Sequence, residues 1–473
     1  MPTKAKPRQL SHPTRAERTE RGKAARKAVP RSSAGVYEPA ADRADPVSLL
    51  EGQAASRVPE LIPIRYGRML ASPFAFYRGA ALLMAEDLAP APVSGMKVQC
   101  CGDAHMMNFG VYASPERNLV FDANDFDETL PGPWEWDVKR LVASLFIGAR
   151  DAGFPRREQE RAVREATAEY RNAMATFAGQ GNLVVWYAHI DVDRLMNDLA
   201  PLLSKRMERR TEKTLAKARG RNSYSALMKL ARDVDGEPRI VSDPPLIVPI
   251  GELDGTAERG ETFEILHELL NEYRATLQAD RRVLLEQFRL VDFARKVVGV
   301  GSVGTRCWIA LMLGTDPDDA LFLQIKEAQK SVLEGALGPS EYRNHGERVV
   351  AGQHLMQAVS DIFLGWLRVP AREGEPSRDF YGRQLRDGKG SFEVEGSVPD
   401  GLVIYGRVCA WTLARAHARS GDRIAIASYL GKGDTFDRAM VQFAVDYAEQ
   451  NDRDYAALKD AVESGRIAAE SGI

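Results

Sequence analysis

Four polar side chains in two neighbouring motifs have the types and the spacing that phosphoryl transfer requires. Asp103 and Asn108 stand five positions apart in the sequence Gly-Asp-Ala-His-Met-Met-Asn, and Asp125 and Asp127 flank a phenylalanine shortly afterwards. A carboxylate can orient a hydroxyl and accept its proton, while carboxylate and amide oxygens bind the Mg²⁺ that bridges nucleotide phosphates. We therefore predict that Asp103 is the catalytic base. The predicted metal ligands are Asn108, Asp125 and Asp127, of which the first two also take part in catalysis. Aspartates that only cap turns are the alternative.

A glycine-rich segment far downstream has a matching chemistry. Residues 299–304 read Gly-Val-Gly-Ser-Val-Gly, and Lys326 follows in an apolar stretch. Such a loop can cover nucleotide phosphates, and an ammonium on a later strand can hold the α- and β-phosphates. We therefore expect Lys326 to bind nucleotide and to take part in catalysis. The loop residues expected to bind nucleotide are Gly299, Gly301, Ser302 and Gly304.

The same glycine pattern also occurs in dinucleotide-binding folds, where it closes a strand and opens a helix. Residues 305–313, which follow this loop, are rich in residue types that favour strands. This composition favours a glycine hairpin between two strands. The alternative, an NAD-dependent oxidoreductase, requires a helix directly after Gly304.

Three further predictions concern side chains that would support these motifs. We favour Glu347 as the acidic partner of Lys326, because a position in the middle of a helix can face the strand; Glu327 and Glu341 are the alternatives. His105 could be a general base or a metal ligand, but packing of the loop is the role that we favour. We expect the carboxylate of Asp137 to accept hydrogen bonds from the backbone of the catalytic loop, which is a structural role.

Hydrophobic periodicity and turn residues indicate the elements that hold these motifs. The order β-β-β-α-β-β over residues 291–386 is the one that a kinase small lobe requires. The first half of the chain shows predicted strands at 96–100 and 118–122 that form a hairpin with its turn at 114–117. The predicted helices are 45–90, 136–152, 156–177, 342–359, much of 181–290, and 402–473 with breaks at Gly421 and at 431–433.

Together these elements predict an α+β protein with the two-lobed fold of protein kinases, a mainly helical large lobe and a small antiparallel β-sheet lobe. The glycine loop precedes the catalytic loop in ordinary kinases but follows it here, so we predict a circular permutation. Residues 405–421 or residues 46–95 would then supply the helix that comes before the catalytic loop. The predicted units are a disordered basic tail (1–45), a large-lobe catalytic part (46–180), a helical insertion (181–290), a small nucleotide-binding lobe (291–400) and a C-terminal helical part of the large lobe (401–473).

Composition limits the partners of the protein. The 473 residues carry a net charge of −2, which provides no overall attraction to nucleic acid or to a membrane surface. The four cysteines are Cys100, Cys101, Cys307 and Cys409; they lack metal-binding spacing, so we expect reduced, buried thiols. No apolar run reaches the length of a membrane span. We therefore expect a cytoplasmic protein without specific nucleic-acid binding. Residues 1–32 are rich in Lys, Arg and Pro, which predicts the disordered tail.

The sequence also resembles known families. The motif around Asp103 and Asn108 resembles the catalytic loop of aminoglycoside and choline phosphotransferases, and residues 125–127 resemble their metal-binding motif, although Cys101 stands where those families usually have histidine. Three other segments resemble the bacterial domain-of-unknown-function 2252 family more closely, with a likeness over nearly the whole chain after residue 45. This family is regarded as related to the protein-kinase-like superfamily. The three segments are 72–79, 124–136 and 381–389.

We therefore expect an ATP- and Mg²⁺-dependent phosphotransferase that acts on a hydroxyl acceptor, with a small molecule favoured over a protein. Nucleotidyl transfer would use the same residues with the nucleotide turned around. A nucleotide-binding regulatory module without catalysis would be expected to lack one of the four central residues, and none is missing. Arg78, Arg383 and the basic segment 205–221 are candidates for contacts to an anionic acceptor.

Overall fold

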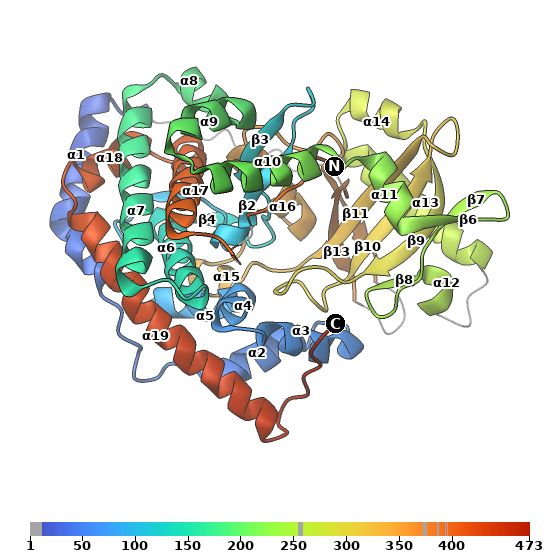
Figure 1. Ribbon diagram of the computed structural model, residues 1–473, viewed down its shortest axis with the longest axis horizontal. Helices are drawn as coiled ribbons and strands as arrows, with labels where there is room; N and C mark the ends of the chain where they lie inside the picture. Colours follow the sequence, from blue (N-terminus) through green and yellow to red (C-terminus); the bar gives the residue numbers. More distant parts are fainter. Residues whose placement is uncertain (1–11, 254–258, 372–375, 386, 393, 395) are drawn as a thin grey trace.

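The computed structural model describes residues 12–253, 259–371, 376–385, 387–392, 394 and 396–473. Figure 1 shows a mainly helical part on the left and an antiparallel sheet on the right. This arrangement confirms the predicted α+β class. Residues 1–11 of the predicted tail and position 386 of the third resembling segment lie outside the described residues.

The sheet contains six strands, and each pairs with its neighbours in antiparallel register. Its order is β12-β13-β11-β10-β9-β8, and α16 (His345–Met356) lies between β11 and β12 in the sequence. The predicted order β-β-β-α-β-β over residues 291–386 is therefore confirmed, with one short additional helix, α15 (Glu334–Leu337), before α16. The strands are β8 (Ile247–Pro249), β9 (Arg289–Lys296), β10 (Cys307–Leu313), β11 (Ala320–Ala328), β12 (Gly365–Val369) and β13 (Arg378–Gln384).

Both faces of the sheet are covered, which explains why β11 is apolar on both sides. Helix α13 (Arg259–Thr276) packs Leu270 and Tyr273 against one face, and α11 (Ser223–Leu230) packs Leu227 against the other. Both helices belong to residues 181–290, which are mainly helical as predicted. That segment also contains α8 (Asn182–Tyr187), β5 (Ile190–Asp191), α9 (Val192–Leu199), α10 (Lys205–Arg219), β6 (Ala231–Val234), β7 (Glu237–Ile240), α12 (Ile250–Leu253) and α14 (Ala279–Leu285).

The glycine loop joins β9 to β10, so it lies between two paired strands. Gly299 and Gly304 have φ values of 71° and 87°, which a residue with a side chain rarely adopts. The chain continues into a strand at Cys307, and this finding excludes the helix that a dinucleotide-binding arrangement requires after Gly304.

The predicted catalytic loop (residues 102–108) and the second acidic motif (residues 125–127) adjoin two small sheets in the helical part. β1 (Lys97–Cys100) pairs with β4 (Leu130–Pro133), while β2 (Phe109–Ala113) pairs with β3 (Leu119–Ala123). The predicted hairpin between the strands at 96–100 and 118–122 is therefore wrong in its pairing, although both strands exist. The catalytic loop separates β1 from β2, and it is β2 that forms the hairpin with β3.

Helices α6 (Trp134–Asp151), α7 (Arg156–Gly179) and α17 (Pro399–Ser420) form the centre of the helical part (Figure 1). Helices α18 (Arg423–Leu430) and α19 (Thr435–Glu463) complete it, and the gaps between α17, α18 and α19 confirm the predicted breaks. Among the described residues, none of the helices is both long enough and apolar enough to cross a membrane.

Residues 12–45 are ordered, which corrects the predicted disorder for this part of the predicted tail (1–45). Residues Arg15–Ala28 form α1, which Thr14 caps through reciprocal hydrogen bonds with Glu17. The helix packs on α18 so closely that a Cβ on Gly22 would lie 2.1 Å from the carbonyl oxygen of Ala425. Composition alone predicted disorder because α1 has few apolar residues and depends on a partner helix that is distant in sequence.

Four helices of residues 46–88 lie between the helical part and the sheet in the lower half of Figure 1. Val58, Leu61 and Ile64 from this region pack against Val297 and Val303 at the glycine loop. The N-terminal helices therefore support the loop from outside the sheet. They are α2 (Pro46–Ala54), α3 (Ile62–Met69), α4 (Pro73–Gly79) and α5 (Ala81–Leu88).

Candidate active site

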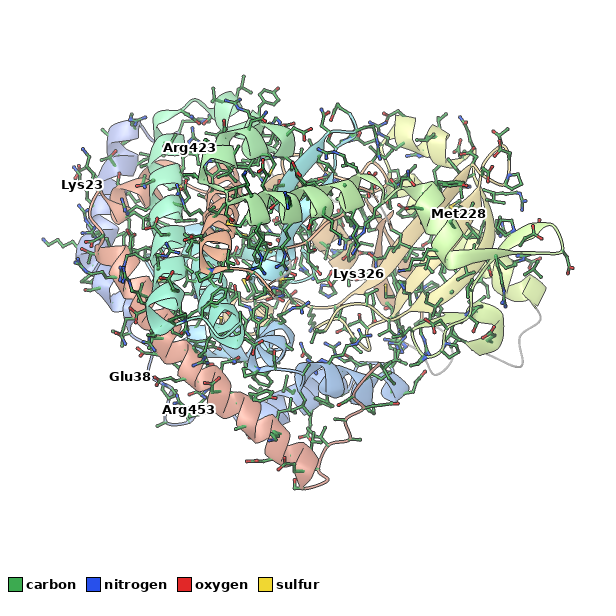
Figure 2. All side chains as sticks on the ribbon, viewed as in Figure 1. Lys23, Glu38, Met228, Lys326, Arg423 and Arg453 are labelled. Atoms are coloured by element: carbon green, nitrogen blue, oxygen red, sulfur yellow. The ribbon has the colours of Figure 1, made fainter. Side chains whose placement is uncertain are left out.

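A cavity of about 500 Å³ lies where the helical part, the sheet and the N-terminal helices meet. Most of the predicted site residues line it, although they come from distant segments of the chain. Gly304 does not line the cavity, and Lys326 lies just behind the lining, at the centre of the molecule in Figure 2. The predicted residues in the lining are Asp103, Asn108, Asp125, Asp127, Gly299, Gly301 and Ser302.

The catalytic loop begins with a backbone conformation that only glycine adopts easily. Gly102 has a φ of 85°, and a Cβ at this position would lie 2.2 Å from the carbonyl oxygen of Glu128. The Asp137 carboxylate accepts the N–H groups of Cys101 and Gly102 at 2.6 and 2.9 Å. The predicted structural role of Asp137 is therefore confirmed. On its other side, Asp137 lies 3.1 Å from Nε2 of His417 on α17.

All four cysteines are free and buried, as predicted. The thiol of Cys101 donates to the backbone oxygen of Asp125 at 3.2 Å. Cys101 thus connects the loop around Asp103 to residues 125–127.

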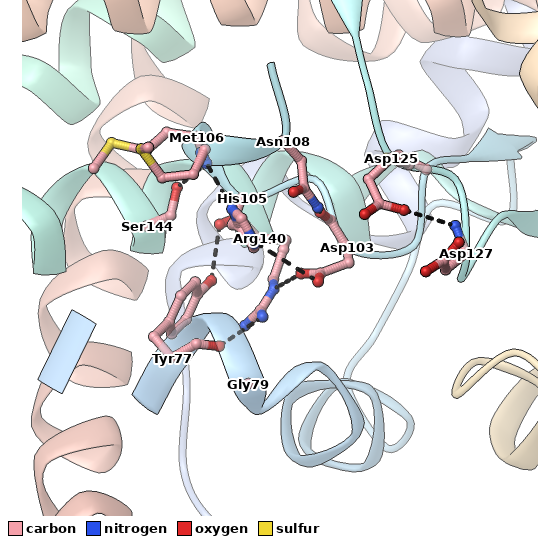
Figure 3. Close-up of polar contacts among 12 residues, drawn as sticks. Tyr77, Gly79, Asp103, His105, Met106, Asn108, Asp125, Asp127, Arg140 and Ser144 are labelled. Carbon is pink, nitrogen blue, oxygen red and sulfur yellow. Dashed lines mark hydrogen bonds and ion pairs between the residues drawn. The ribbon is translucent and has the colours of Figure 1, made fainter. Parts of the chain in front are cut away.

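Arg140 orients the predicted catalytic base (Figure 3). Its Nε donates to Oδ1 of Asp103 at 2.7 Å, and its Nη2 donates to the backbone oxygen of Tyr77 at 2.7 Å. The guanidinium also lies 3.9 Å from the centre of the Tyr77 ring, so its position is fixed on three sides. Sequence reasoning missed Arg140, although its spacing of three residues from Asp137 on one helix was a usable signal.

His105 packs within the loop, in agreement with the favoured prediction. The side chain is 4% exposed, and its Nδ1 accepts the N–H of Met107 at 3.1 Å. Burial lowers the pKa of His105 well below its ordinary value, and the positive charges of Arg78 and Arg140 lower it further. The ring is therefore neutral, with Nε2 lying 3.8 Å from Oδ2 of Asp103.

The two predicted metal ligands next to Asp103 keep oxygen atoms available. Asn108 donates its amide N–H to the backbone oxygen of Asp103 at 2.7 Å, which leaves its Oδ1 unused by that contact. Oδ1 of Asp125 accepts the N–H of Asp127 at 3.2 Å, and the Asp125 side chain is 34% exposed. Burial raises the pKa of Asp125, and the neighbouring charge of Asp127 raises it further. Figure 3 shows Asp103, Asn108 and Asp125 side by side.

Lys326 pairs with the second acidic motif rather than with a glutamate. Its Nζ lies 2.6 Å from Oδ2 of Asp127 and 3.5 Å from Oδ2 of Asp125. Tyr381 donates its hydroxyl to Oδ1 of Asp127 at 2.6 Å, so both oxygens of this carboxylate accept hydrogen bonds. Although burial opposes ionisation of Asp127, Lys326 and Tyr381 hold its pKa below the ordinary value. The same two aspartates outweigh the burial of Lys326 and hold its pKa well above its ordinary value.

The prediction that Glu347 is the acidic partner of Lys326 is therefore wrong. Adjacent residues of a strand point to opposite faces, which places Glu327 on the other side of the sheet, where it pairs with Arg306 and Arg378. From α16, it is Arg348 that reaches the motif: it donates to the backbone oxygens of Asp127, Thr129 and Gln329 at 2.7 to 2.8 Å. No local sequence pattern indicated this contact.

The backbone of the glycine loop is held from outside by the N-terminal helices. Arg68 donates to the Gly299 oxygen at 2.7 Å, Arg57 donates to the Val303 oxygen, and the Val58 N–H donates to the Gly304 oxygen at 2.8 Å. Gly304 therefore anchors the loop and does not face the cavity.

Comparisons with known proteins place the chain in one family. No curated protein and no solved structure matches it. The model of a family described as "Uncharacterized protein conserved in bacteria (DUF2252)" matches residues 57–461, a range that contains every predicted site residue. Since this match covers far more than half of the sequence, the chain belongs to the DUF2252 family.

Proposed function

We propose that the protein is an ATP- and Mg²⁺-dependent phosphotransferase that acts on a hydroxyl acceptor. One observation carries this proposal: Asp103, Asn108 and Asp125 meet in one cavity with the glycine loop, and Lys326 contacts the acidic motif across 199 positions of sequence. These are the groups that phosphoryl transfer needs, because its catalysis consists mostly of positioning and charge stabilisation. Aspartates that only cap turns do not need a buried lysine beside them, whereas Lys326 lies next to Asp125 and Asp127.

The donor set fits Mg²⁺. The Asn108 oxygen and the Asp125 carboxylate are the ligands that we propose, since both are oxygens and both face the cavity. Asp127 enters the proposal as the partner of Lys326, because both of its oxygens are already engaged. Among the described residues, no group of three or more His, Cys, Asp or Glu side chains could hold a metal alone. Two protein ligands are sufficient for Mg²⁺, which takes its other ligands from water and phosphate. When bound, the metal would neutralise charge on the phosphates.

Asp103 performs the proton transfer in this proposal. Oδ1 is held by Arg140, so Oδ2 is the oxygen that can accept the proton of the acceptor hydroxyl. A bond forms between the acceptor oxygen and the γ-phosphorus, the bond from that phosphorus to the bridging oxygen breaks, and ADP leaves. The Lys326 ammonium can stabilise negative charge on the phosphates once nucleotide competes for it with Asp127.

A circularly permuted kinase-like fold is part of the proposal. The sheet with its order β-β-β-α-β-β and its lysine on β11 corresponds to a small lobe. Helix α17 corresponds to the helix before the catalytic loop, because Ser420 accepts the N–H of Gln99 on β1 at 3.1 Å and His417 contacts Asp137. These contacts favour α17 over residues 46–95 for that role.

Thermal unfolding with and without Mg-ATP tests the nucleotide site. Ligand at one hundred times its dissociation constant stabilises the folded state by about 2.7 kcal/mol. We expect a Mg²⁺-dependent increase in Tm that Asp125→Ala abolishes and that Asp318→Ala, a change at an exposed aspartate in the β10–β11 turn, leaves intact. Analysis of the products then separates phosphoryl from nucleotidyl transfer. The absence of any shift in the folded wild-type protein would refute the proposal, and nucleotide binding without turnover on any acceptor would favour a regulatory module.

A further inference from the structure

Three arginines of the N-terminal helical segment have buried nitrogens without hydrogen-bond partners in the described part of the chain. They are Arg57, Arg65 and Arg78, whose Nε atoms are all unpartnered, as is Nη1 of Arg65. Arg57 is 7% exposed and Arg65 is fully buried, and their hydrogen bonds go to neutral oxygens of Val303, Gln53 and Gly79. None of the three has a carboxylate within ion-pair distance among the described residues.

Other buried arginines have either an ion-pair partner or more hydrogen bonds. Arg140 and Arg415, for example, each contact an aspartate at 2.5 to 2.7 Å. Arg348 and Arg423 lack a carboxylate within ion-pair distance among the described residues, but each donates to three oxygen atoms. A buried guanidinium without a counter-ion is costly. Burial accordingly lowers the pKa of Arg57 to about 10 and that of Arg65 to about 9. A bound anion would remove this cost, so the arrangement suits a site that is filled during function.

The unpartnered arginines face the cavity that contains the proposed catalytic base. Arg57 and Arg78 line it together with Asp103, while Arg65 donates to the Gly79 oxygen in the same wall. Arg78 lies close enough for its charge to act on both Asp103 and His105. It is therefore on the side where the acceptor hydroxyl must approach. In the proposed function, nucleotide is bound by Lys326 on β11 and by the acidic motif between β3 and β4, while the glycine loop, which Arg57 contacts at the Val303 oxygen, borders the same cavity.

We propose that Arg57 and Arg78 bind a phosphate group carried by the acceptor, so that the substrate is a phosphorylated compound with a free hydroxyl. A phosphate presents several oxygens to two planar guanidinium groups, which is the geometry that arginine recognises best. This proposal rests on the proposed phosphotransferase function. The terminal phosphate of the nucleotide has the same chemistry, and the experiment must distinguish the two sources.

Titration of inorganic phosphate into the full-length protein, followed by calorimetry, is the test. It is made without nucleotide and again with a saturating, non-hydrolysable Mg-ATP analogue. We expect phosphate to bind in both conditions, and Arg78→Gln to weaken phosphate at least tenfold while changing nucleotide affinity less than twofold. The exposed Arg194→Gln is the matched control and should behave as wild type. Arg78→Lys, which keeps the charge but loses the planar fork, should have intermediate affinity.

Folding and binding can be separated in this experiment. The Nε of Arg78 has no hydrogen-bond partner among the described residues, so Arg78→Gln should have a ligand-free Tm at or above that of wild type. Phosphate that binds only without nucleotide would overturn the assignment to the acceptor, because the arginines would then hold nucleotide phosphate. No phosphate binding, or equal binding by Arg78→Gln, would overturn the site itself. If the wild-type protein binds phosphate but not the nucleotide analogue, the phosphotransferase function and the assignment of the phosphate to an acceptor are refuted, while the phosphate site itself is supported.

Discussion

Replacement of Arg348 by methionine tests how α16 holds the second acidic motif. The guanidinium donates to the backbone oxygens of Thr129, Asp127 and Gln329 at 2.7, 2.8 and 2.8 Å, and the side chain is 1% exposed. Methionine occupies a similar volume but has no donor. One buried and two partly buried carbonyl groups would therefore lose this partner at once.

The magnitude follows from these contacts. An unsatisfied buried carbonyl costs roughly 1–3 kcal/mol, so roughly 3–9 kcal/mol is the upper range for the three, because two of them are only partly buried. Removal of a buried charge whose Nε has no partner offsets part of this cost. We expect Arg348→Met to lower the free energy of unfolding by about 3–5 kcal/mol, close to the effect of breaking a buried ion pair. Arg348→Lys keeps one donor direction and should lose about half as much.

Urea denaturation followed by circular dichroism measures the change. The control is Arg343→Met, at an exposed position just before the same helix, which should stay within about 0.5 kcal/mol of wild type. Because Arg348 and Lys326 hold the two ends of Asp127, Arg348→Met should also weaken binding of Mg-nucleotide. A loss below about 1 kcal/mol, or one equal to that of Arg343→Met, would refute the reasoning.

Three other substitutions have expected outcomes. At Gly102 the φ is 85° and a Cβ would lie 2.2 Å from a carbonyl oxygen, whereas at Gly153 the φ is 75° and a Cβ would meet open space. Gly102→Ala should therefore lower the free energy of unfolding, measured by thermal denaturation, by at least about 2 kcal/mol more than Gly153→Ala does. Equal losses in the two variants would contradict the clash at Gly102. Burial raises the pKa of Glu128 to about 7 from 4.5, so its proton stabilises the folded state below pH 4.5 and that stability is lost as the pH rises through 7. Glu128→Gln should remove up to about 3 kcal/mol of this pH dependence, and an unchanged profile of stability against pH would exclude Glu128 as its source. Arg415→Met leaves the buried Asp122 carboxylate without its ion-pair partner and should cost about 3–5 kcal/mol in urea denaturation; a loss below about 1 kcal/mol would contradict this expectation.

The parts of the fold that depend on local pattern could be predicted from the sequence. Alternating apolar residues and turn signals were sufficient for the order of strands around Lys326, because each strand is continuous in sequence. Asp103 and Asn108 could be recognised by their short spacing, and Asp137 by its place on the next helix. The pairing of the strands was less predictable. A hairpin between β1 and β3 was expected because strands close in sequence commonly pair, but β1 pairs with β4.

The contacts that complete the site could not be predicted, because their partners are far apart in the chain. Lys326 and Asp127 are separated by 199 positions, and Arg348 is 221 positions from the oxygen of Asp127 that it binds. No periodicity connects such residues. The sequence also could not predict that Arg57 and Arg78 lack a nearby carboxylate among the described residues, because that depends on which side chains surround them in three dimensions.

The contacts of α17 also determine when the catalytic loop can be completed during synthesis. Asp122 and Asp137 are made early, but Arg415 and His417 follow 293 and 280 residues later. At typical elongation rates, the ribosome needs about 15–60 s to make that length of chain. Throughout this interval the buried carboxylates lack their partners, so a growing chain can acquire its small sheet but not a finished catalytic loop. The loop around Asp103 should therefore reach its final packing only after residues 415–417 have been synthesised.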